Sequence, residues 1–243
     1  MKAIKLSILA AIMLIAGITT TVNAQSADDI ISKHIEAIGG IDNWNKVKTL
    51  KMVCGLNQQG MEISMVQTID LVKGARVDIS VMGMNGYQII TPNGGWMYMP
   101  FQGSDKIDTM KPEMVQTYMK QFDIKSHQLI DYKAKGTKAE LAGKDTVDNA
   151  PCYKVKLTDK DGNESIAYFD MNTYQIVRME SKQKSDEGEQ ELVAAYGNYQ
   201  KTSEGIVMPM SVSAQGMEIT YKSIDVNAPV DDKIFIPTKP AGK

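Results

Sequence analysis

The chain has 243 residues, a formal net charge of −2 at pH 7 and only two arginines, Arg76 and Arg178. Binding to nucleic-acid phosphates requires a cationic surface that this composition does not supply, so nucleic acid is excluded as an expected partner. Methionine is the outlier of the composition, with 17 residues, and its flexible, polarizable side chain adapts to irregular apolar shapes.

Residues 1–24 have the pattern of a cleavable secretory signal peptide. Two lysines lie in the first five residues, residues 8–18 carry no polar side chain, and small residues precede the expected cut after Ala24. The apolar run is shorter than the ~20 residues that span a bilayer, which favours cleavage over an uncleaved membrane anchor. The residue directly after the cut is Gln25 and not a cysteine, so no lipid attachment is expected there. We expect an exported, soluble protein whose residues 25–243 form a single domain.

A short helix is predicted at the start of this domain. Ser26 can cap it, and Asp29 completes a capping-box pattern. Gly39 and Gly40 end it. His34 lies on the apolar face, where a packing role with one satisfied ring nitrogen is favoured over a functional role. That apolar face carries Ile30, Ile31, Ile35 and Ile38.

Beyond the helix the pattern changes to the two-residue period of half-buried strands. Residues 61–65 and 76–81 alternate between apolar and polar side chains, and Met82 and Met84 are expected to share a face around Gly83. The run therefore predicts strands whose methionines lie on one side of a sheet.

Two turn signals divide the strands that follow. Asn85-Gly86 predicts a hairpin turn, and residues 92–95 predict another. Residues 87–90 form a strand between them. The next strand, residues 96–100, is expected to place two aromatic residues on one face and two methionines on the other: Trp96 and Tyr98, and Met97 and Met99.

The middle of the chain predicts an amphipathic helix. Pro112 suits the first helical turn. The polar face carries only two lysines, too few for strong attraction to anionic lipid, so the helix is expected to cover a sheet rather than lie in a membrane. Its apolar stripe consists of Met114, Val115, Tyr118, Met119 and Phe122.

The second half returns to strands in a meander. There is no Pro/Ser-rich linker and no fixed-period repeat, which favours one domain built from a strongly curved antiparallel sheet with helices against its inner face. The predicted strands are residues 153–158, 165–169, 175–179, 191–200, 206–215 and 217–226.

Catalytic and metal-binding motifs are absent from the sequence. It contains no nucleophile elbow, no HExxH zinc motif and no glycine-rich phosphate loop. An unrecognised hydrolase stays an alternative, and it would require His127 to cluster with a serine and a carboxylate. Residues 159–163 faintly resemble a calcium loop, but Glu164 follows at once, which favours a hairpin turn. No catalytic residue, metal or cofactor is expected.

The two cysteines leave two structures open. Cys54 and Cys152 could form one disulfide in an oxidising compartment, or they could be two separate buried thiols that act as small hydrophobes. The methionines likewise could line an apolar ligand site or simply fill a core.

Two segments resemble the family of the periplasmic lipoprotein carrier LolA. Residues 76–100 contain an arginine strand followed by Gly-Gly-Trp-Met-Tyr-Met-Pro, which is similar to the family's "R-w … d-G-x-x-l-W-x-Y-d-P" region. Residues 227–237 are similar to its ending, "N-x-x-i-d-d-x-x-F-x-x-P". Asn93 and Met99 replace two aspartates of the family pattern. Arg76 occupies its arginine position.

This resemblance implies a mainly β, α+β fold. The expected structure is a half-open antiparallel β-barrel of about eleven strands, with helices plugging the concave face. It also implies a non-enzymatic periplasmic carrier that binds the acyl chains of a lipoprotein or lipid in an apolar cavity and shuttles it toward the outer membrane. A sensor or interaction module of the same fold is the alternative.

The partners and site residues follow from that expectation. The partners are an acylated lipoprotein or lipid and transient membrane-protein donors and acceptors, and the protein is expected to be a monomer. The expected lipid-binding residues are Met61, Met65, Met82, Met84, Trp96, Met97, Tyr98, Met99, Met114, Tyr118, Met119 and Phe122.

Overall fold

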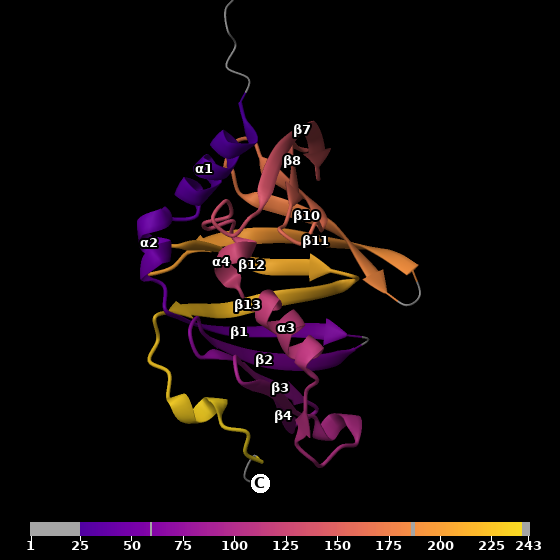
Figure 1. The fold of residues 1–243 in the computed structure, drawn as a ribbon. Coiled ribbons are helices and arrows are strands. Elements are labelled where there is room, and N and C mark those ends of the chain that lie inside the picture. Colours follow the sequence, from indigo (N-terminus) through magenta and orange to yellow (C-terminus); the bar gives the residue numbers. More distant parts are fainter. Residues whose placement is uncertain (1–24, 59, 186–187, 240–243) are drawn as a thin grey trace, which may run out of the picture.

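The computed structural model describes residues 25–58, 60–185 and 188–239. Within these ranges thirteen strands form one antiparallel sheet, in the order β6-β5-β4-β3-β2-β1-β13-β12-β11-β10-β9-β8-β7 (Figure 1). The two end strands, β6 and β7, do not pair, so the sheet curves without closing. This confirms a half-open antiparallel sheet with helical cover, with thirteen described strands in place of about eleven. The predicted signal peptide, residues 1–24, lies outside the described residues.

The elements follow the predicted pattern along most of the chain. The helices are α1 (Ala27–Ala37), α2 (Ile41–Lys46), α3 (Pro112–Gln121) and α4 (Ile124–His127), with 3₁₀ turns η1 (Pro100–Gln102) and η2 (Asp232–Phe235). The strands are β1 (Thr49–Gln58), β2 (Met61–Asp70), β3 (Gly74–Val81), β4 (Met84–Thr91), β5 (Gly94–Tyr98), β6 (Asp108–Thr109), β7 (Lys138–Val147), β8 (Ala150–Thr158), β9 (Glu164–Asp170), β10 (Ile176–Ser185), β11 (Gly188–Lys201), β12 (Val207–Ala214) and β13 (Met217–Val226).

The first helix begins as predicted. The Ser26 hydroxyl accepts a hydrogen bond from the Asp29 backbone N–H, and the Asp29 carboxylate accepts one from the Ser26 backbone, which completes the capping box. His34 is fully buried, and its Nδ1–H donates to the Tyr174 carbonyl oxygen over 2.9 Å. The prediction of a packing histidine with one satisfied nitrogen is therefore confirmed.

Helices cover one face of the sheet, which we call the concave face (Figure 1). A first core cluster lies between α1, α2 and the central strands; its buried members are Ile38, Trp44, Val47, Leu50, Met52, Ile69, Ala75, Ile130, Ile206, Met208 and Val226. A second cluster lies between α1 and strands β8 to β10; its buried members are Ala27, Ile30, Ile31, Leu129, Val155, Leu157, Ala167, Phe169 and Ile176. These two clusters hold the helices on the sheet.

The β3–β4 turn corrects the predicted hairpin. The turn is at Met82 and Gly83, whose φ angles are 50° and 82°. Both residues have the positive φ that a tight two-residue hairpin turn requires. Asn85 and Gly86 instead lie inside β4, where they pair with Ser80 and Ile79 of β3. Met82 therefore does not share a strand face with Met84.

Gly86 has a packing reason to be a glycine inside a strand. A Cβ there would lie 2.5 Å from the Tyr98 carbonyl oxygen and 2.8 Å from the Phe101 ring. The residue allows β5 and η1 to pack closely against β4. The other predicted turns are confirmed, including that between β8 and β9, where the Asp159 carboxylate accepts hydrogen bonds from the backbone N–H groups of Asp161 and Asn163.

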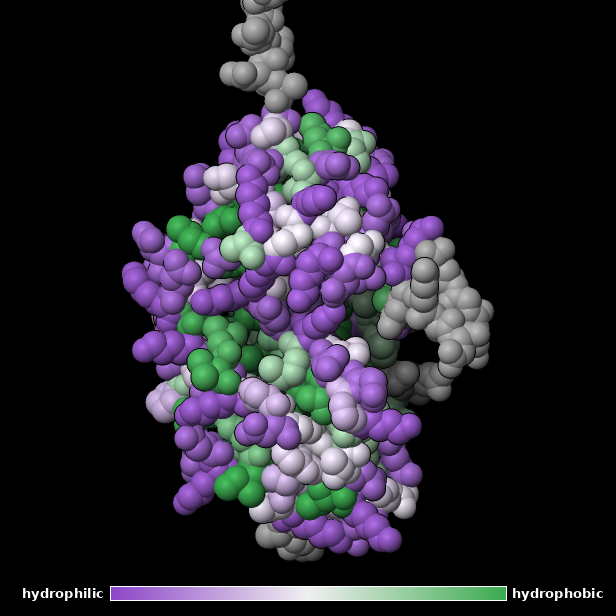
Figure 2. Space-filling view, viewed as in Figure 1, coloured by the Kyte–Doolittle hydropathy of each residue, from purple (hydrophilic) through white to green (hydrophobic). Residues whose placement is uncertain are grey.

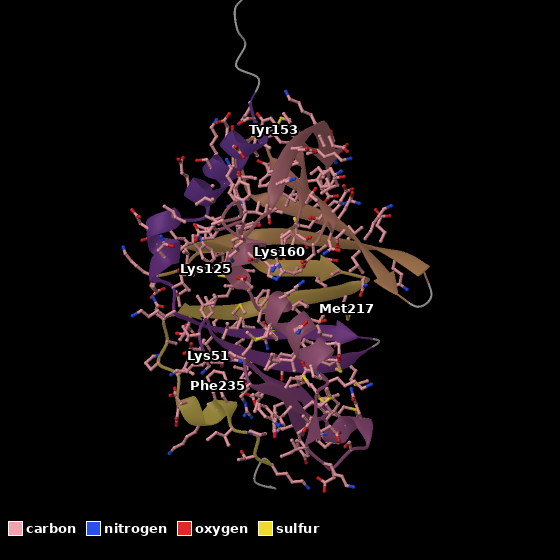
Figure 3. All side chains as sticks on the ribbon, in the orientation of Figure 1. Lys51, Lys125, Tyr153, Lys160, Met217 and Phe235 are labelled. Carbon is pink, nitrogen blue, oxygen red and sulfur yellow. The ribbon has the colours of Figure 1, made fainter. Side chains whose placement is uncertain are left out.

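The C-terminal segment lies on the face of the sheet opposite the helices, where η2 contacts β3 and β4. Arg76 anchors it, because its Nη1 donates to the Ile234 carbonyl oxygen over 2.8 Å. The same guanidinium forms an ion pair with Asp78 and stacks 4.5 Å from the centre of the Tyr87 ring. In Figure 3 Phe235 marks this segment, beside the strands of the first half.

Both cysteines are free and buried. The alternative of two separate thiols therefore describes the structure, and the disulfide does not form. None of the helices within the described ranges is long and apolar enough to cross a membrane.

Candidate functional site

The concave face of the central strands is assembled by simple alternation. Leu50, Met52 and Cys54 of β1 point to the helix-covered side, and the registers place Ile69 of β2 and Val226 of β13 beside Leu50. The remaining concave positions follow from these pairings. They are Leu56; Ile63, Met65 and Gln67; Ala75, Val77, Ile79 and Val81; Gln88 and Ile90; Ile219, Tyr221 and Ile224.

Charged side chains are excluded from this face over a wide area. In the described parts of β1 to β5, β12 and β13, alternation places every Lys, Arg, Asp and Glu on the opposite side of the sheet. Lys222, at the β13 bulge, follows the same rule, because it approaches Gly55 on the outer side. The surface facing the helices is therefore apolar or neutral.

Methionines gather at the edge of the concave face that lies next to the hairpin turns. Met61 and Met84 are 41% and 43% exposed, at the ends of β2 and β4 next to their turns. Met65 and Met97 lie farther in and are partly buried. Figure 3 places Met217 at the same end of the sheet, where β13 begins.

α3 covers the β4–β5 end of the concave face. Gly95 makes this possible, since a Cβ there would lie 2.7 Å from Met110 Sδ and 3.0 Å from Val115 Cγ2. No residue of α3 is buried, and Met114 is 37% exposed. The apolar stripe of the helix thus faces the sheet without sealing against it. Figure 2 shows apolar atoms around α3, over β13 and β1.

The twelve expected lipid-binding residues divide between several places. Those on the concave face or in the helical layer over it are Met61, Met65, Met84, Met97, Met114, Tyr118, Met119 and Phe122. Met82 is in the β3–β4 turn and is 79% exposed. Trp96 and Tyr98 lie on the opposite face, and Met99 is buried between β5 and η1. Alternation explains the difference for Trp96 and Tyr98, because their neighbours Gly95 and Met97 face α3.

Two hollows lie near these strands, and both are open and partly polar. One, of about 560 Å³, lies at the hairpin turns and is lined by Gly60, Met61, Glu62, Ser64, Ser80, Met82 and Gly83. The other, of about 390 Å³, lies beside the C-terminal segment and includes Arg76, Asp78 and Thr238. Neither corresponds to the expected apolar cavity of the concave face.

Three groups on the concave face were not among the expected site residues. Tyr196 of β11, Tyr221 of β13 and Cys54 of β1 have raised pKa values, because burial disfavours their charged forms. The pKa of Tyr221 rises to about 12 and that of Cys54 to about 11. The strand alternation contained this signal, because Tyr221 shares a face with Ile219 in the sequence.

The cluster of a serine, a histidine and a carboxylate that a hydrolase would need is not assembled around His127. His127 Nε2 lies 2.9 Å from the Gln121 carbonyl oxygen, and the Ser126 hydroxyl donates to the Asp123 carboxylate over 2.7 Å. Lys135 donates to the same Ser126 hydroxyl. Serine and histidine therefore make separate interactions. Among the described residues, no group of three His, Cys, Asp or Glu side chains could hold a metal ion.

Comparison with known proteins identifies the fold. The sequence matches no protein-family model and no curated protein. A DUF1329 family protein from Desulfovibrio piger is similar in structure, with a TM-score of 0.56, 12% identity, and coverage of 86% of this chain and 96% of that one. A LolA superfamily protein from Nitrosomonas europaea has a TM-score of 0.54, 13% identity, and coverage of 87% and 98%. The chain therefore has a LolA-like fold, as its sequence resemblance implied.

Proposed function

We propose that the protein is a non-enzymatic carrier that binds the acyl chains of a lipid or lipoprotein on its concave face. The observation that carries this proposal is the wide, uncharged, methionine-bordered face that α3 covers without sealing. A LolA-like fold supports it, although a fold alone does not determine function.

The physical role of such a face is to remove hydrocarbon from water. Each exposed CH₂ costs about 0.8 kcal/mol, so a sixteen-carbon chain faces a barrier on the order of 12 kcal/mol when it crosses an aqueous compartment uncovered. Side chains of the concave face replace water around the chain. Methionines at the open end adapt to different chain shapes.

We further propose that the protein is exported and moves its cargo through the periplasm toward the outer membrane. A cleaved signal peptide would release the domain from the inner membrane, and transient donor and acceptor proteins would load and unload it. As a monomer, the domain would diffuse between the two membranes.

Binding is tested with two adjacent substitutions in β2. Met65→Glu places a carboxylate on the concave face, whereas Ser64→Glu places one on the outer face, where Ser64 is exposed. Residues 25–243 are titrated with a pyrene-labelled fatty acid. We expect Met65→Glu to weaken binding at least tenfold, since a buried charge is costly, and Ser64→Glu to leave it unchanged. Equal affinities for all three proteins would contradict binding on the concave face.

Transfer is tested separately. The protein should accelerate movement of a pyrene-labelled lipid from donor to acceptor vesicles, in proportion to protein concentration. Binding without accelerated transfer would exclude the carrier and favour the sensor or interaction module.

A further inference from the structure

Two tyrosines interrupt the apolar concave face at its centre. Tyr221 of β13 packs against the first core cluster and Tyr196 of β11 against the second. Only β12 separates their strands. The registers place them near each other, because Tyr196 pairs with Val212 of β12 and Val212 pairs with Ile219 of β13, two residues before Tyr221 on the same face. The two clusters adjoin, since Ile35 of α1 packs against both.

Neither hydroxyl has a hydrogen-bond partner within the described residues. Two other tyrosines are partnered by contrast: Tyr199 donates to the Ile176 carbonyl oxygen over 2.6 Å, and Tyr168 donates to the Glu180 carboxylate over 2.9 Å. Neither oxygen is among the fully buried unpartnered side-chain atoms, so each hydroxyl reaches solvent in the free protein and is available to a ligand that replaces that water. Phenylalanine would fill the same volume at both positions but would offer the ligand no hydrogen-bond donor.

The surroundings of the two hydroxyls limit which ligand group can accept hydrogen bonds from them. No lysine or arginine lies on the concave positions of the described parts of β1 to β5, β12 and β13, so these strands offer no counter-ion to an ionised carboxylate or phosphate that is desolvated there. The hydroxyls can donate to a neutral oxygen at much lower cost. A carbonyl oxygen has two lone pairs and accepts two such bonds.

We propose that the Tyr196 and Tyr221 hydroxyls bind the carbonyl oxygen of the neutral ester or amide that links an acyl chain to its carrier. This inference rests on the proposed acyl-binding function and adds a chemical preference to it. The face then selects esterified or amide-linked chains over free fatty-acid anions and over plain hydrocarbon. Cargo is recognised at the linkage, while the apolar surroundings accept the chain.

Three probes with one pyrene-labelled chain test this preference: the alkane, its methyl ester, and the free carboxylate at pH 8. The unmodified protein should bind the ester about fivefold to tenfold more tightly than the alkane, which corresponds to one or two ordinary hydrogen bonds. The carboxylate should bind more weakly than the ester. The double variant Tyr196→Phe/Tyr221→Phe should lose the ester preference and keep its affinity for the alkane.

The control is Tyr98→Phe, which removes a hydroxyl on the opposite face that donates to Asp105. It should retain the full ester preference. Circular dichroism and thermal unfolding confirm that each variant is folded. If no probe binds the unmodified protein, the proposed function itself is wrong. If the probes bind but the double variant keeps the ester preference, or the carboxylate binds best, the tyrosine inference alone is overturned.

Discussion

His34 in α1 and Tyr174 in the β9–β10 turn are joined by a hydrogen bond of 2.9 Å from Nδ1–H to the carbonyl oxygen, in a fully buried site. The ring also meets Phe169 edge-on at 5.3 Å, and its Nε2 has no hydrogen-bond partner within the described residues. Burial lowers the pKa of His34 from 6.5 to about 4. The helix is therefore held on the sheet by a neutral imidazole.

The stability of the fold should fall as the pH falls from 6.5 toward 4. Below pH 6.5 the unfolded chain binds a proton on His34, while the folded chain resists it until about pH 4. Unfolding is thus favoured at low pH by up to roughly 3 kcal/mol. Denaturant titrations at pH 7.5 and pH 4.5 measure the difference.

Substitution isolates the contribution of this histidine. In His34→Asn the amide can keep the hydrogen bond to Tyr174 but does not titrate, so the loss of stability between the two pH values should shrink. His127→Asn, whose ring is exposed, should retain the full loss. An unchanged pH dependence in His34→Asn would contradict the assignment.

Gly95→Ala should displace α3. The new side chain would meet Met110 and Val115 at distances shorter than normal contact, and overpacking of this kind costs about 1–3 kcal/mol. Gly55→Ala is the matched control, because it is also a strand glycine without a positive φ and its Cβ would find ordinary contacts of 3.6 Å and longer. Thermal unfolding compares them. Equal stability of both variants would show that α3 does not depend on close approach at Gly95.

Alternation and capping made most of this fold predictable. The capping box at Ser26 and the two-residue period of strands such as residues 153–158 are local, so short stretches of sequence contain them. The half-open sheet required the family resemblance, because strand pairing between β1 and β13 joins residues 50 and 226 across the whole domain. Local patterns carry no information on such distant pairing.

The site and one edge of the sheet were less predictable, for three physical reasons. Asn85-Gly86 has better turn residues than Met82-Gly83, but β4 needs Gly86 for close packing, so tertiary contact overrides local preference. Alternation separates Trp96 from Met97 but does not say which faces the helices. β7 was missed because its exposed edge lacks an alternating apolar pattern.

Both thiols should be unreactive in the folded protein and available after unfolding. Burial keeps Cys54 and Cys152 from reagents and raises the pKa of each thiol, which lowers the reactive thiolate fraction. A thiol-reactive dye should label two sites in guanidinium without reductant and almost none in buffer. A reductant should leave the thermal midpoint unchanged. Failure to label unfolded, unreduced protein would reveal a disulfide.

Arg76→Lys should loosen the C-terminal segment. Lysine keeps the charge but cannot reproduce the planar guanidinium, which pairs with Asp78 through two nitrogens, donates to the Ile234 carbonyl oxygen and stacks on Tyr87. Hydrogen exchange should accelerate in residues 232–238, with a loss of stability of about 1–2 kcal/mol.

Arg178→Lys is the internal control for this prediction. The chain has a second arginine that pairs with a carboxylate and lies over a tyrosine ring, but this arginine lies away from the C-terminal segment. Arg178 pairs with Glu180 at 2.8 Å and lies over Tyr168 at 5.7 Å, far along the sheet on β10. Its substitution should leave exchange in residues 232–238 unaltered. If both variants accelerate that exchange equally, the segment responds to general loss of stability; if only Arg76→Lys does so, the Ile234 hydrogen bond is the anchor.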